Sequence, residues 1–255
     1  MNLEIKPIPA LSDNYIWALV QDEYCILVDP GEAAPAMEFL DTEGLKLAAL
    51  LLTHHHPDHV GGVEAIRKGH PCPAWGPADP RMPAGISTVS EGDHIELAEL
   101  GLSFETIETP GHTSSHVIFH APGILLSGDT LFSAGCGRIF EGTPEQMLHS
   151  LDKLAALPGE TRFYCGHEYT EANARFALEV EPDNPAVRDH LERARELGRA
   201  GLPTLPDTLE HDRQVNPFLR TREPAVAEAA RRREKLPDQR PESVFGAIRR
   251  WKDQF

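Results

Sequence analysis

Long hydrophobic runs, cysteines and basic residues are all scarce in this chain of 255 residues. The longest apolar runs, such as Leu47–Leu52, are far shorter than the ~20 residues that a membrane-spanning helix needs. The N-terminus has no cationic segment followed by an apolar stretch, so no signal peptide is expected. The four cysteines, Cys25, Cys72, Cys136 and Cys165, show no paired spacing, which favours reduced thiols and a cytoplasmic location.

Positive charge is also unevenly distributed along the chain. There are 24 basic and 40 acidic residues, for a net charge of -16. Residues 1–172 hold 8 basic and 25 acidic residues, a net charge of -17, whereas residues 173–255 carry +1. Nonspecific nucleic-acid binding needs Lys and Arg against phosphates, so we expect no nucleic-acid partner and no membrane partner. The 40% hydrophobic and 25% charged content excludes a disordered chain.

Alternating and apolar segments predict a sheet-rich part followed by a helical part. We expect a domain over residues 1–169 and a second, helical domain over 170–255, with the proline-containing segment 201–215 as a loop. Thr143 followed by Pro144 predicts a capped start for a helix over 144–157. The other expected helices are 33–41, 60–68, 169–180, 186–200, 224–235 and 243–251. The expected strands are 3–8, 15–20, 25–28, 47–52, 102–106, 116–120, 124–127 and 162–165.

A cluster of histidines follows the buried strand expected at 47–52. His54, His56, Asp58 and His59 place four possible metal ligands within six residues. In extended backbone His54 and His56 point to the same side, whereas Asp58 and His59 lie beyond Pro57, around a turn. The spacing therefore predicts two half-sites for metal, and His55 is not expected to be a ligand.

Two half-sites need further ligands, and three candidates follow strand-like segments. His112, Asp129 and His167 are each preceded by glycine, which lets the backbone approach a crowded centre. Imidazole and carboxylate groups suit Zn, Fe or Mn, and the lack of thiolates argues against a closed structural zinc site. Asp29 can serve as an outer carboxylate on a ligand histidine or simply shape a turn. His116 and His120 fit a core role as well as a supporting one.

The remaining histidines have no such context and are interpreted as ordinary residues. They are His70, His94, His149, His190 and His211.

The motif over 54–59 with Asp129 resembles the signature of the metallo-β-lactamase superfamily. Further segments, at 8–15, 110–113, 135–143, 166–170 and 249–253, resemble the glyoxalase II (hydroxyacylglutathione hydrolase) family over the whole chain. This resemblance implies an α/β (α+β) fold, namely a four-layer αβ/βα metallo-β-lactamase sandwich followed by a smaller helical C-terminal domain. It also implies a metal-dependent thioesterase.

The resemblance implies a role for each candidate residue. His54, His56 and His112 would hold a first metal. Asp58, His59 and His167 would hold a second, with Asp129 bridging the two and Asp58 and Asp129 acting as the catalytic carboxylates. The metals would be two divalent ions, zinc first, with iron or manganese as alternatives. The residues implied to bind glutathione are Arg138, Phe140, Tyr169, Arg249 and Lys252.

Charge supports these glutathione contacts independently of the resemblance. Glutathione carries two carboxylates and one ammonium group, so an acidic domain would repel it unless cations lay nearby. Arg138 is the only basic residue between Arg81 and Lys153, and Arg249 and Lys252 share one helix face by their spacing. Arg138 keeps the charge of the lysine found in one common form of the family pattern. Phe140 loses the hydroxyl of the corresponding tyrosine.

The implied reaction is hydrolysis of S-(2-hydroxyacyl)glutathione, typically S-D-lactoylglutathione, to glutathione and D-lactate by a metal-bridged hydroxide. This is the second step of methylglyoxal detoxification. The alternatives are a mononuclear-iron persulfide dioxygenase of the same superfamily and a non-catalytic metal-binding protein. The complete second set of ligands argues against a single iron. The absence of an exposed apolar helix favours a monomer.

Overall fold

The computed structural model describes residues 3–238 and 240–255, and these form two compact units. The first unit contains 3–108, 115–128 and 166–168, and the second contains 109–114, 129–165 and 169–255 without residue 239. Each unit is therefore assembled from several stretches of chain. The domain division at 169/170 expected from the sequence stays a prediction. None of the helices in the described ranges has the length and apolar character required to cross a membrane.

The first unit contains a mixed sheet in the order β1-β2-β3-β4-β5-β6. The first three strands are antiparallel, and β3 to β6 run parallel. Its strands are β1 (Glu4–Ala10), β2 (Asn14–Gln21), β3 (Tyr24–Val28), β4 (Lys46–Leu51), β5 (Ala74–Pro77) and β6 (Ser87–Val89). Its helices are α1 (Ala33–Glu43), α2 (Pro57–Val60) and α3 (Val63–Gly69).

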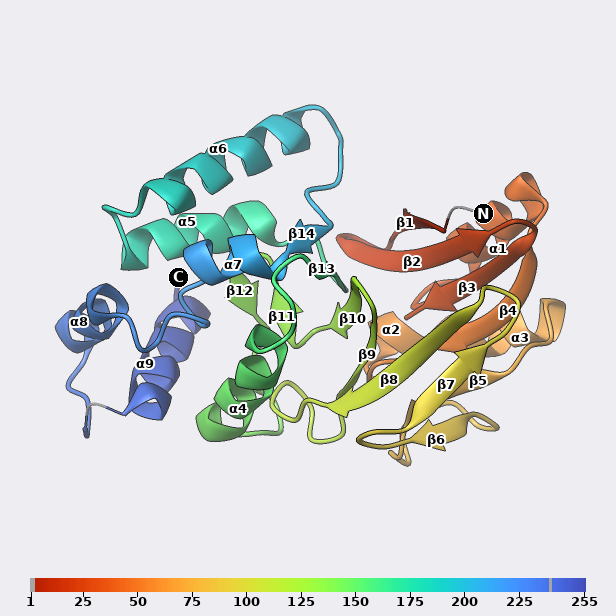
Figure 1. Cartoon of the computed structure of the whole chain (residues 1–255), viewed down its shortest axis with the longest axis horizontal. Coiled ribbons are helices and arrows are strands. Elements are labelled where there is room, and N and C mark those ends of the chain that lie inside the picture. The colour runs from red at the N-terminus through yellow and green to blue at the C-terminus, as the bar shows by residue number, and fades with distance from the viewer. Residues whose placement is uncertain (1–2, 239) are drawn as a thin grey trace. The chain divides into compact units, whose positions relative to one another are not determined.

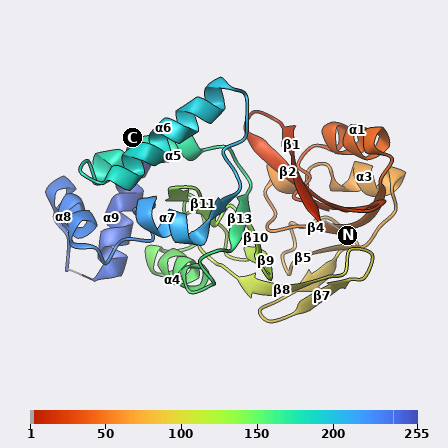
Figure 2. The same ribbon diagram turned by 45° about the horizontal axis from the view of Figure 1, so that its top comes forward.

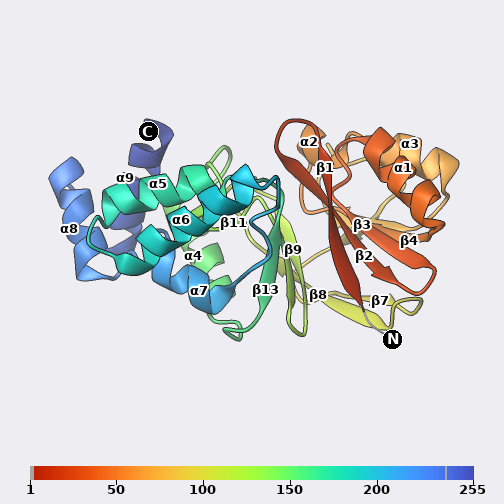
Figure 3. The same ribbon diagram turned by 90° about the horizontal axis from the view of Figure 1, so that it is seen from above.

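A second set of strands in the first unit forms an antiparallel meander. It consists of β7 (His94–Leu97), β8 (Leu102–Glu108), β9 (Val117–Ala121) and β10 (Ile124–Gly128). Figure 3 shows α1 and α3 on one face of the mixed sheet and β7 and β8 on the other. The mixed sheet is therefore covered on both faces, which explains why its central strands are apolar along nearly their whole length.

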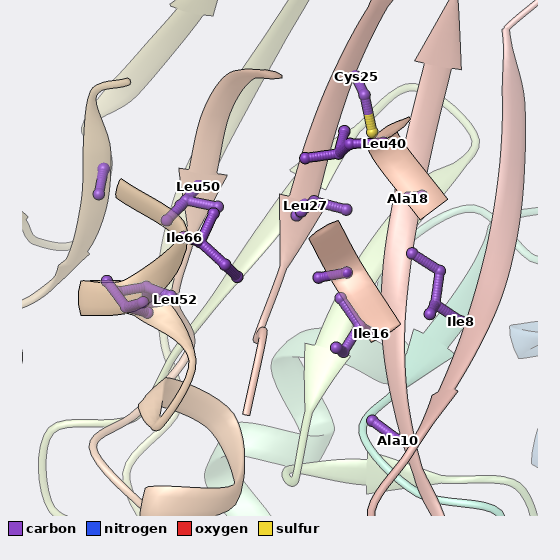
Figure 4. Packing of buried hydrophobic residues seen from close by; sticks show 13 residues of the cluster. Ile8, Ala10, Ile16, Ala18, Cys25, Leu27, Leu40, Leu50, Leu52 and Ile66 are labelled. Carbon is purple, nitrogen blue, oxygen red and sulfur yellow. The ribbon is translucent and has the colours of Figure 1, made fainter. Parts of the chain in front are cut away.

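Alternate residues of β2 show how the core of this unit is built. Ile16 and Ala18 join a buried cluster with Leu40 of α1 and Ile66 of α3, as Figure 4 shows. Trp17 points to the opposite face and is also buried. Each large apolar side chain buried in this way contributes about 1.5–3 kcal/mol to folding.

The second unit combines short strands with helices. Figure 2 shows α5 (Thr170–Val180) and α6 (Pro185–Arg199) side by side, and they make many contacts. The strands are β11 (Leu131–Phe132), β12 (Gly135–Cys136), β13 (Arg162–Cys165) and β14 (Asp207–Thr208), paired as β11-β12 and β13-β14. The other helices are α4 (Pro144–Ala155), α7 (Leu209–Val215), α8 (Pro224–Arg233) and α9 (Pro241–Asp253), labelled in Figure 1.

In this unit the start of α4 agrees with the sequence prediction, whereas the segment 201–215 differs from it in part. The capped start of α4 is confirmed, because Thr143 accepts a hydrogen bond from the Gln146 amide and the Gln146 side chain accepts one from the Thr143 amide. The loop expected at 201–215 is wrong in its last part, which forms α7. The Thr208 side chain caps this short helix by accepting from the His211 amide, and Leu209 and Val215 are buried.

Candidate metal centre

The histidine cluster of the first unit lies where two parallel strands end. Asp29 follows β3, and Thr53 and His54 come soon after β4, so both segments meet at one edge of the sheet. The Asp29 carboxylate accepts hydrogen bonds from the Thr53 amide at 2.7 Å and from the Thr53 hydroxyl at 2.6 Å. Asp29 has a positive φ of 50°, a conformation that Asp adopts more readily than most residues. Asp29, directly after β3, thereby fixes the start of the segment 53–59, called the ligand loop below because it carries His54, His56, Asp58 and His59.

Asp58, His59 and His167 converge in the same unit. The Asp58 Oδ2 atom lies 3.5 Å from His59 Nε2 and 3.4 Å from His167 Nε2. One ligand atom from each of the three residues lies within 4.8 Å of the others, a spacing that one metal ion can bridge. The structure therefore brings together the three residues expected to bind the second metal.

The position of His167 depends on backbone contacts far away in the sequence. The Tyr15 amide donates to the Gly166 carbonyl at 2.8 Å, and the Glu168 amide donates to the Asp13 carbonyl at 2.9 Å. These two hydrogen bonds place residues 166–168 alongside the start of β2. His167 is thus fixed within the first unit next to Asp58.

Hydrogen bonds to outer groups set which nitrogen of each histidine can bind metal. His59 Nδ1 faces Asp29 Oδ2 at 3.0 Å, and His167 Nδ1 faces Asp13 Oδ1 at 2.7 Å. A carboxylate accepts, so each Nδ1 must donate its hydrogen and each Nε2 keeps the lone pair that a metal needs. Both Nε2 atoms are the ones that face Asp58.

The same reasoning applies to His54. The Thr53 hydroxyl donates to Asp29, so its oxygen accepts the hydrogen from His54 Nδ1 at 3.0 Å. The lone pair of His54 therefore lies on Nε2, which faces His56 Nδ1 at 3.0 Å. The His116 ring stacks on His54 with ring centroids 4.8 Å apart, which gives His116 a supporting position. His55, which we did not expect to be a ligand, has Nδ1 3.8 Å from Asp79.

The charge of Asp58 is stabilised by its neighbours. Burial alone would raise the pKa of Asp58, but the neighbouring imidazole rings of His167 and His59 and a hydrogen bond from Asn14 outweigh burial and lower this pKa below its usual range. Asn14 donates to Asp58 Oδ2 at 3.1 Å. Asp58 is therefore ionised at neutral pH, which is the form that binds a cation.

The second unit contains the other two predicted ligands, His112 and Asp129. His112 Nδ1 lies 2.8 Å from the Arg138 carbonyl, which can only accept, so His112 also keeps its lone pair on Nε2. That Nε2 lies 3.4 Å from Asp129 Oδ2, and both residues are buried. A Cβ at Gly137 would lie 2.0 Å from the Asp129 carbonyl oxygen, so only glycine fits there.

Two of the three predicted cations of the second unit lie beside one carboxylate. Asp253 Oδ1 lies 3.0 Å from Arg249 Nη2 and 3.4 Å from Arg138 Nε. Arg249 is buried and also donates to the Cys136 carbonyl at 2.9 Å. The Lys252 ammonium donates to the Ala172 carbonyl at 3.0 Å.

The two aromatic residues predicted to bind glutathione are exposed. The Phe140 ring lies edge-on to His112, with ring centroids 5.3 Å apart, and 59% of the residue is exposed. The Tyr169 ring packs in the same way against Phe132.

Sequence reasoning missed three residues that support these groups. Asp13 and Asn14 were given no role beyond belonging to the segment 8–15 that resembles the family, although they hydrogen-bond His167 and Asp58. Asp253 lies beside two predicted cations. In the sequence, the only indication of this contact is that Asp253 lies four residues after Arg249 and three after Arg250, a spacing that places side chains on one helix face.

The fixed Nε2 lone pairs and the ionised Asp58 fit a divalent metal. If the Asp13 carboxylate sets the tautomer of His167, Asp13→Ala should lower metal affinity or activity by roughly 10–100-fold. Asp13→Asn is the matched variant, because its amide oxygen can still accept from Nδ1, and it should lose much less. Metal content after dialysis and kcat measure the effect. Equal metal content and kcat in Asp13→Ala and the wild type would contradict this role.

Comparisons with known proteins give two family matches that meet at residue 167. Residues 11–167 match the metallo-beta-lactamase superfamily, and residues 168–255 match the hydroxyacylglutathione hydrolase C-terminus. A hydroxyacylglutathione hydrolase from Alkalilimnicola ehrlichii is 50% identical over 253 residues, covering 98% of this chain and 99% of its own.

Two solved structures are also similar. A B3 metallo-beta-lactamase, BLEG-1, is 23% identical with a TM-score of 0.65, covering 85% of this chain and 99% of its own. A protein crystallised in a di-iron-bound form, TTHA1623, is 29% identical with a TM-score of 0.56, covering 64% of this chain and 91% of its own. The predicted fold, a metallo-β-lactamase fold with a helical C-terminal part, is confirmed.

Proposed function

The chain belongs to the hydroxyacylglutathione hydrolase family of the metallo-β-lactamase superfamily, and from this premise we propose how its residues carry out the reaction. It is a thioester hydrolase that cleaves S-(2-hydroxyacyl)glutathione to glutathione and a 2-hydroxy acid, and it uses divalent metal. The observation that carries this conclusion is the full-length similarity, which includes the helical residues 168–255 as well as the metal motif.

We propose a dinuclear centre, with zinc as the first candidate and iron or manganese as alternatives. His54 and His56 would bind one ion through the nitrogens that face each other, and Asp58, His59 and His167 would bind the other. His112 and Asp129 complete the proposed set on the strength of their sequence positions, with Asp129 bridging. The di-iron form of one similar structure is consistent with two ions.

When bound, the two ions would lower the pKa of a water toward neutrality and polarise the thioester carbonyl. The protein residues hold this arrangement. Asp29 and Asp13 keep the hydrogens of His59 and His167 on the outer nitrogens. Asp58 is placed between those two histidines and can orient the attacking water. A thiolate is a good leaving group, so the chain needs no strong general acid.

Glutathione recognition is proposed for the cations and aromatics of the second unit: Arg138, Phe140, Tyr169, Arg249 and Lys252. Arg249 is buried and hydrogen-bonded, so its contribution would be to carry charge and to hold Asp253. Arg138 is more than half exposed and Lys252 is partly exposed, which suits contact with the glutathione carboxylates. We further propose a monomeric, cytoplasmic protein with four reduced cysteines, consistent with the free thiols of the structure.

A contact between Lys252 and the substrate would make KM depend on pH. Burial, followed by the nearby charge of Arg249, lowers the pKa of Lys252 to about 8. The ammonium group is therefore charged below pH 8 and loses its charge as the pH rises through 8. If it binds a glutathione carboxylate, KM should rise by about tenfold between pH 7 and pH 9 as the charged fraction falls.

Lys252→Arg is the matched variant, since arginine stays charged over this range. It should show no rise in KM, and Lys252→Ala should have a high KM at both pH values. KM and kcat should be measured separately, because ionisation of the attacking water is expected to change kcat with pH. A KM of the wild type that stays constant from pH 7 to pH 9 would contradict a Lys252 contact with substrate.

The direct test of the function is thiol release from S-D-lactoylglutathione by the metal-loaded protein, compared with a chelator-treated sample. Metal-dependent release is expected. Release should fall sharply with a thioester of the same acyl group that lacks the glutathione part. If metal-loaded protein released no thiol but consumed oxygen with glutathione persulfide, the dioxygenase would replace the hydrolase assignment.

A further inference from the structure

A second histidine cluster lies within the second unit, away from the sequence motif for metal. His190 comes from α6, Asp207 from β14 and His211 from the first turn of α7. One ligand atom from each of the three lies within 4.8 Å of the others. The distances are 3.0 Å between His190 Nδ1 and His211 Nε2, 4.0 Å between His190 Nδ1 and Asp207 Oδ2, and 3.8 Å between His211 Nε2 and Asp207 Oδ2.

These distances suit one small cation. Bonds of about 2.0–2.1 Å in tetrahedral geometry separate two ligand atoms by roughly 3.3 Å, and the observed distances lie on either side of that value. Two imidazoles and one carboxylate form a donor set that Zn²⁺ and its neighbours in the transition series prefer, unlike Mg²⁺ or Ca²⁺.

Ser133 fixes the protonation of His190. Its hydroxyl donates to Asp207 Oδ2 at 3.3 Å, so its oxygen accepts the hydrogen of His190 Nε2 at 3.0 Å. The lone pair of His190 is therefore on Nδ1, the atom that faces His211 and Asp207. The serine itself is held by its backbone, since Asn173 donates to the Ser133 carbonyl at 3.2 Å. An outer hydroxyl that orients a ligand histidine is common in metal sites.

The surroundings favour a neutral His190 and a fixed carboxylate. His190 is buried, and the Ser133 hydroxyl keeps the hydrogen of its ring on Nε2. Asp207 Oδ1 accepts from the Thr208 amide at 2.7 Å, and β13 pairs with β14 at Phe163 and Asp207. The His211 side chain is one-third exposed, which leaves a route from solvent.

We propose that His190 Nδ1, Asp207 Oδ2 and His211 Nε2 form a binding site for a divalent transition-metal ion of the Zn²⁺ type, in addition to the ligands of the hydrolytic centre. Such an ion joins α6, β14 and α7, three elements whose sequence positions span residues 185–215. Its effect is structural: it stabilises the helical unit and takes no part in thioester hydrolysis. A hydrogen bond from His211 to His190 is the competing explanation for their 3.0 Å separation.

The experiment measures bound Zn²⁺ per chain by mass spectrometry of the metal after equilibration and removal of free ion. His211→Ala and Asp207→Ala should each hold one equivalent less than the wild type, and the thioesterase kcat of His211→Ala should not change. His149→Ala, which removes an exposed histidine of α4, is the matched control and should keep the full metal content. Zn²⁺ should raise the melting temperature of a His54→Ala/His59→Ala protein, in which each proposed half-site of the hydrolytic centre lacks a ligand, and the further substitution His211→Ala should remove most of that rise.

His211→Gln separates metal binding from a hydrogen bond. Its amide can still donate to His190, but it is a poor zinc ligand, so it should lose the same equivalent of metal as His211→Ala. Measuring the melting temperature in the His54→Ala/His59→Ala background reduces the contribution of both half-sites of the hydrolytic centre to this result. Equal zinc content in the wild type and His211→Ala, with equal melting temperatures in zinc, would overturn the site and leave a hydrogen-bonded cluster.

Discussion

Replacing Asp58 with alanine is expected to remove metal from the hydrolytic centre and to lower kcat by roughly 10³-fold or more. Asp58 Oδ2 is the atom that lies between His59 and His167, at 3.5 and 3.4 Å from their Nε2 atoms. Without it, this half-site keeps two neutral imidazoles and the proposed bridging Asp129, so it loses the carboxylate that belongs to it alone. The contribution of such an ion is several kcal/mol, and each 1.36 kcal/mol corresponds to a factor of ten in rate.

Metal content and kcat should fall together in Asp58→Ala. Asp58→Asn tests the charge, because it keeps the shape and the hydrogen bond partner of Asn14 while removing the carboxylate. It should lose nearly as much metal as the alanine variant. Asp189→Ala removes an exposed carboxylate of α6 and is the control for a general loss of negative charge. If Asp58→Ala retained full metal content and kcat, the proposed second half-site would be wrong.

The sequence identifies candidate ligands that lie close together in the structure most easily where they are neighbours along the chain. His54, His56, Asp58 and His59 lie within six residues after a buried strand, and the chain needs only the end of that strand to bring them together. His167 is different, because its neighbour Asp13 lies 154 residues away and meets it only through the backbone contacts beside β2. The spacing of residues in one sequence does not show which residues far apart along the chain become neighbours in the structure.

The same limit explains the missed helix and the missed cluster. The prolines of residues 201–215 suggested a loop, but the Thr208 cap and the buried Leu209 stabilise α7. Tertiary burial outweighs a weak local signal in a helix this short. His190 and His211 looked ordinary because they lie 21 residues apart, and Asp207, four residues before His211, did not by itself indicate a metal site. The packing of α6 and α7 brings His190 Nδ1 to 3.0 Å from His211 Nε2.

A substitution that adds a single methyl group outside the ligand set, Gly31→Ala, is expected to disturb the metal centre almost as strongly. A Cβ at Gly31 would lie 1.8 Å from the Asp58 carbonyl oxygen and 2.3 Å from its carbonyl carbon. These are backbone atoms, so no side chain can rotate away and the ligand loop itself must move. A displacement of about 1 Å at a catalytic group can cost a factor of about 10² in rate.

Gly31→Ala should therefore lower kcat by roughly 10²-fold and weaken metal retention, with the far-ultraviolet spectrum of the folded protein preserved. Gly198→Ala is the matched control: it lies in α6, a Cβ there meets nothing within 4 Å, and it should gain up to about 1 kcal/mol of helix stability. Wild-type kcat and metal content in Gly31→Ala would mean that the loop after β3 does not set the ligand positions. Asp29 hydrogen-bonds His59, and Gly31 lies directly against the Asp58 backbone. Both proposed ligands of α2 therefore depend on the turn that follows β3.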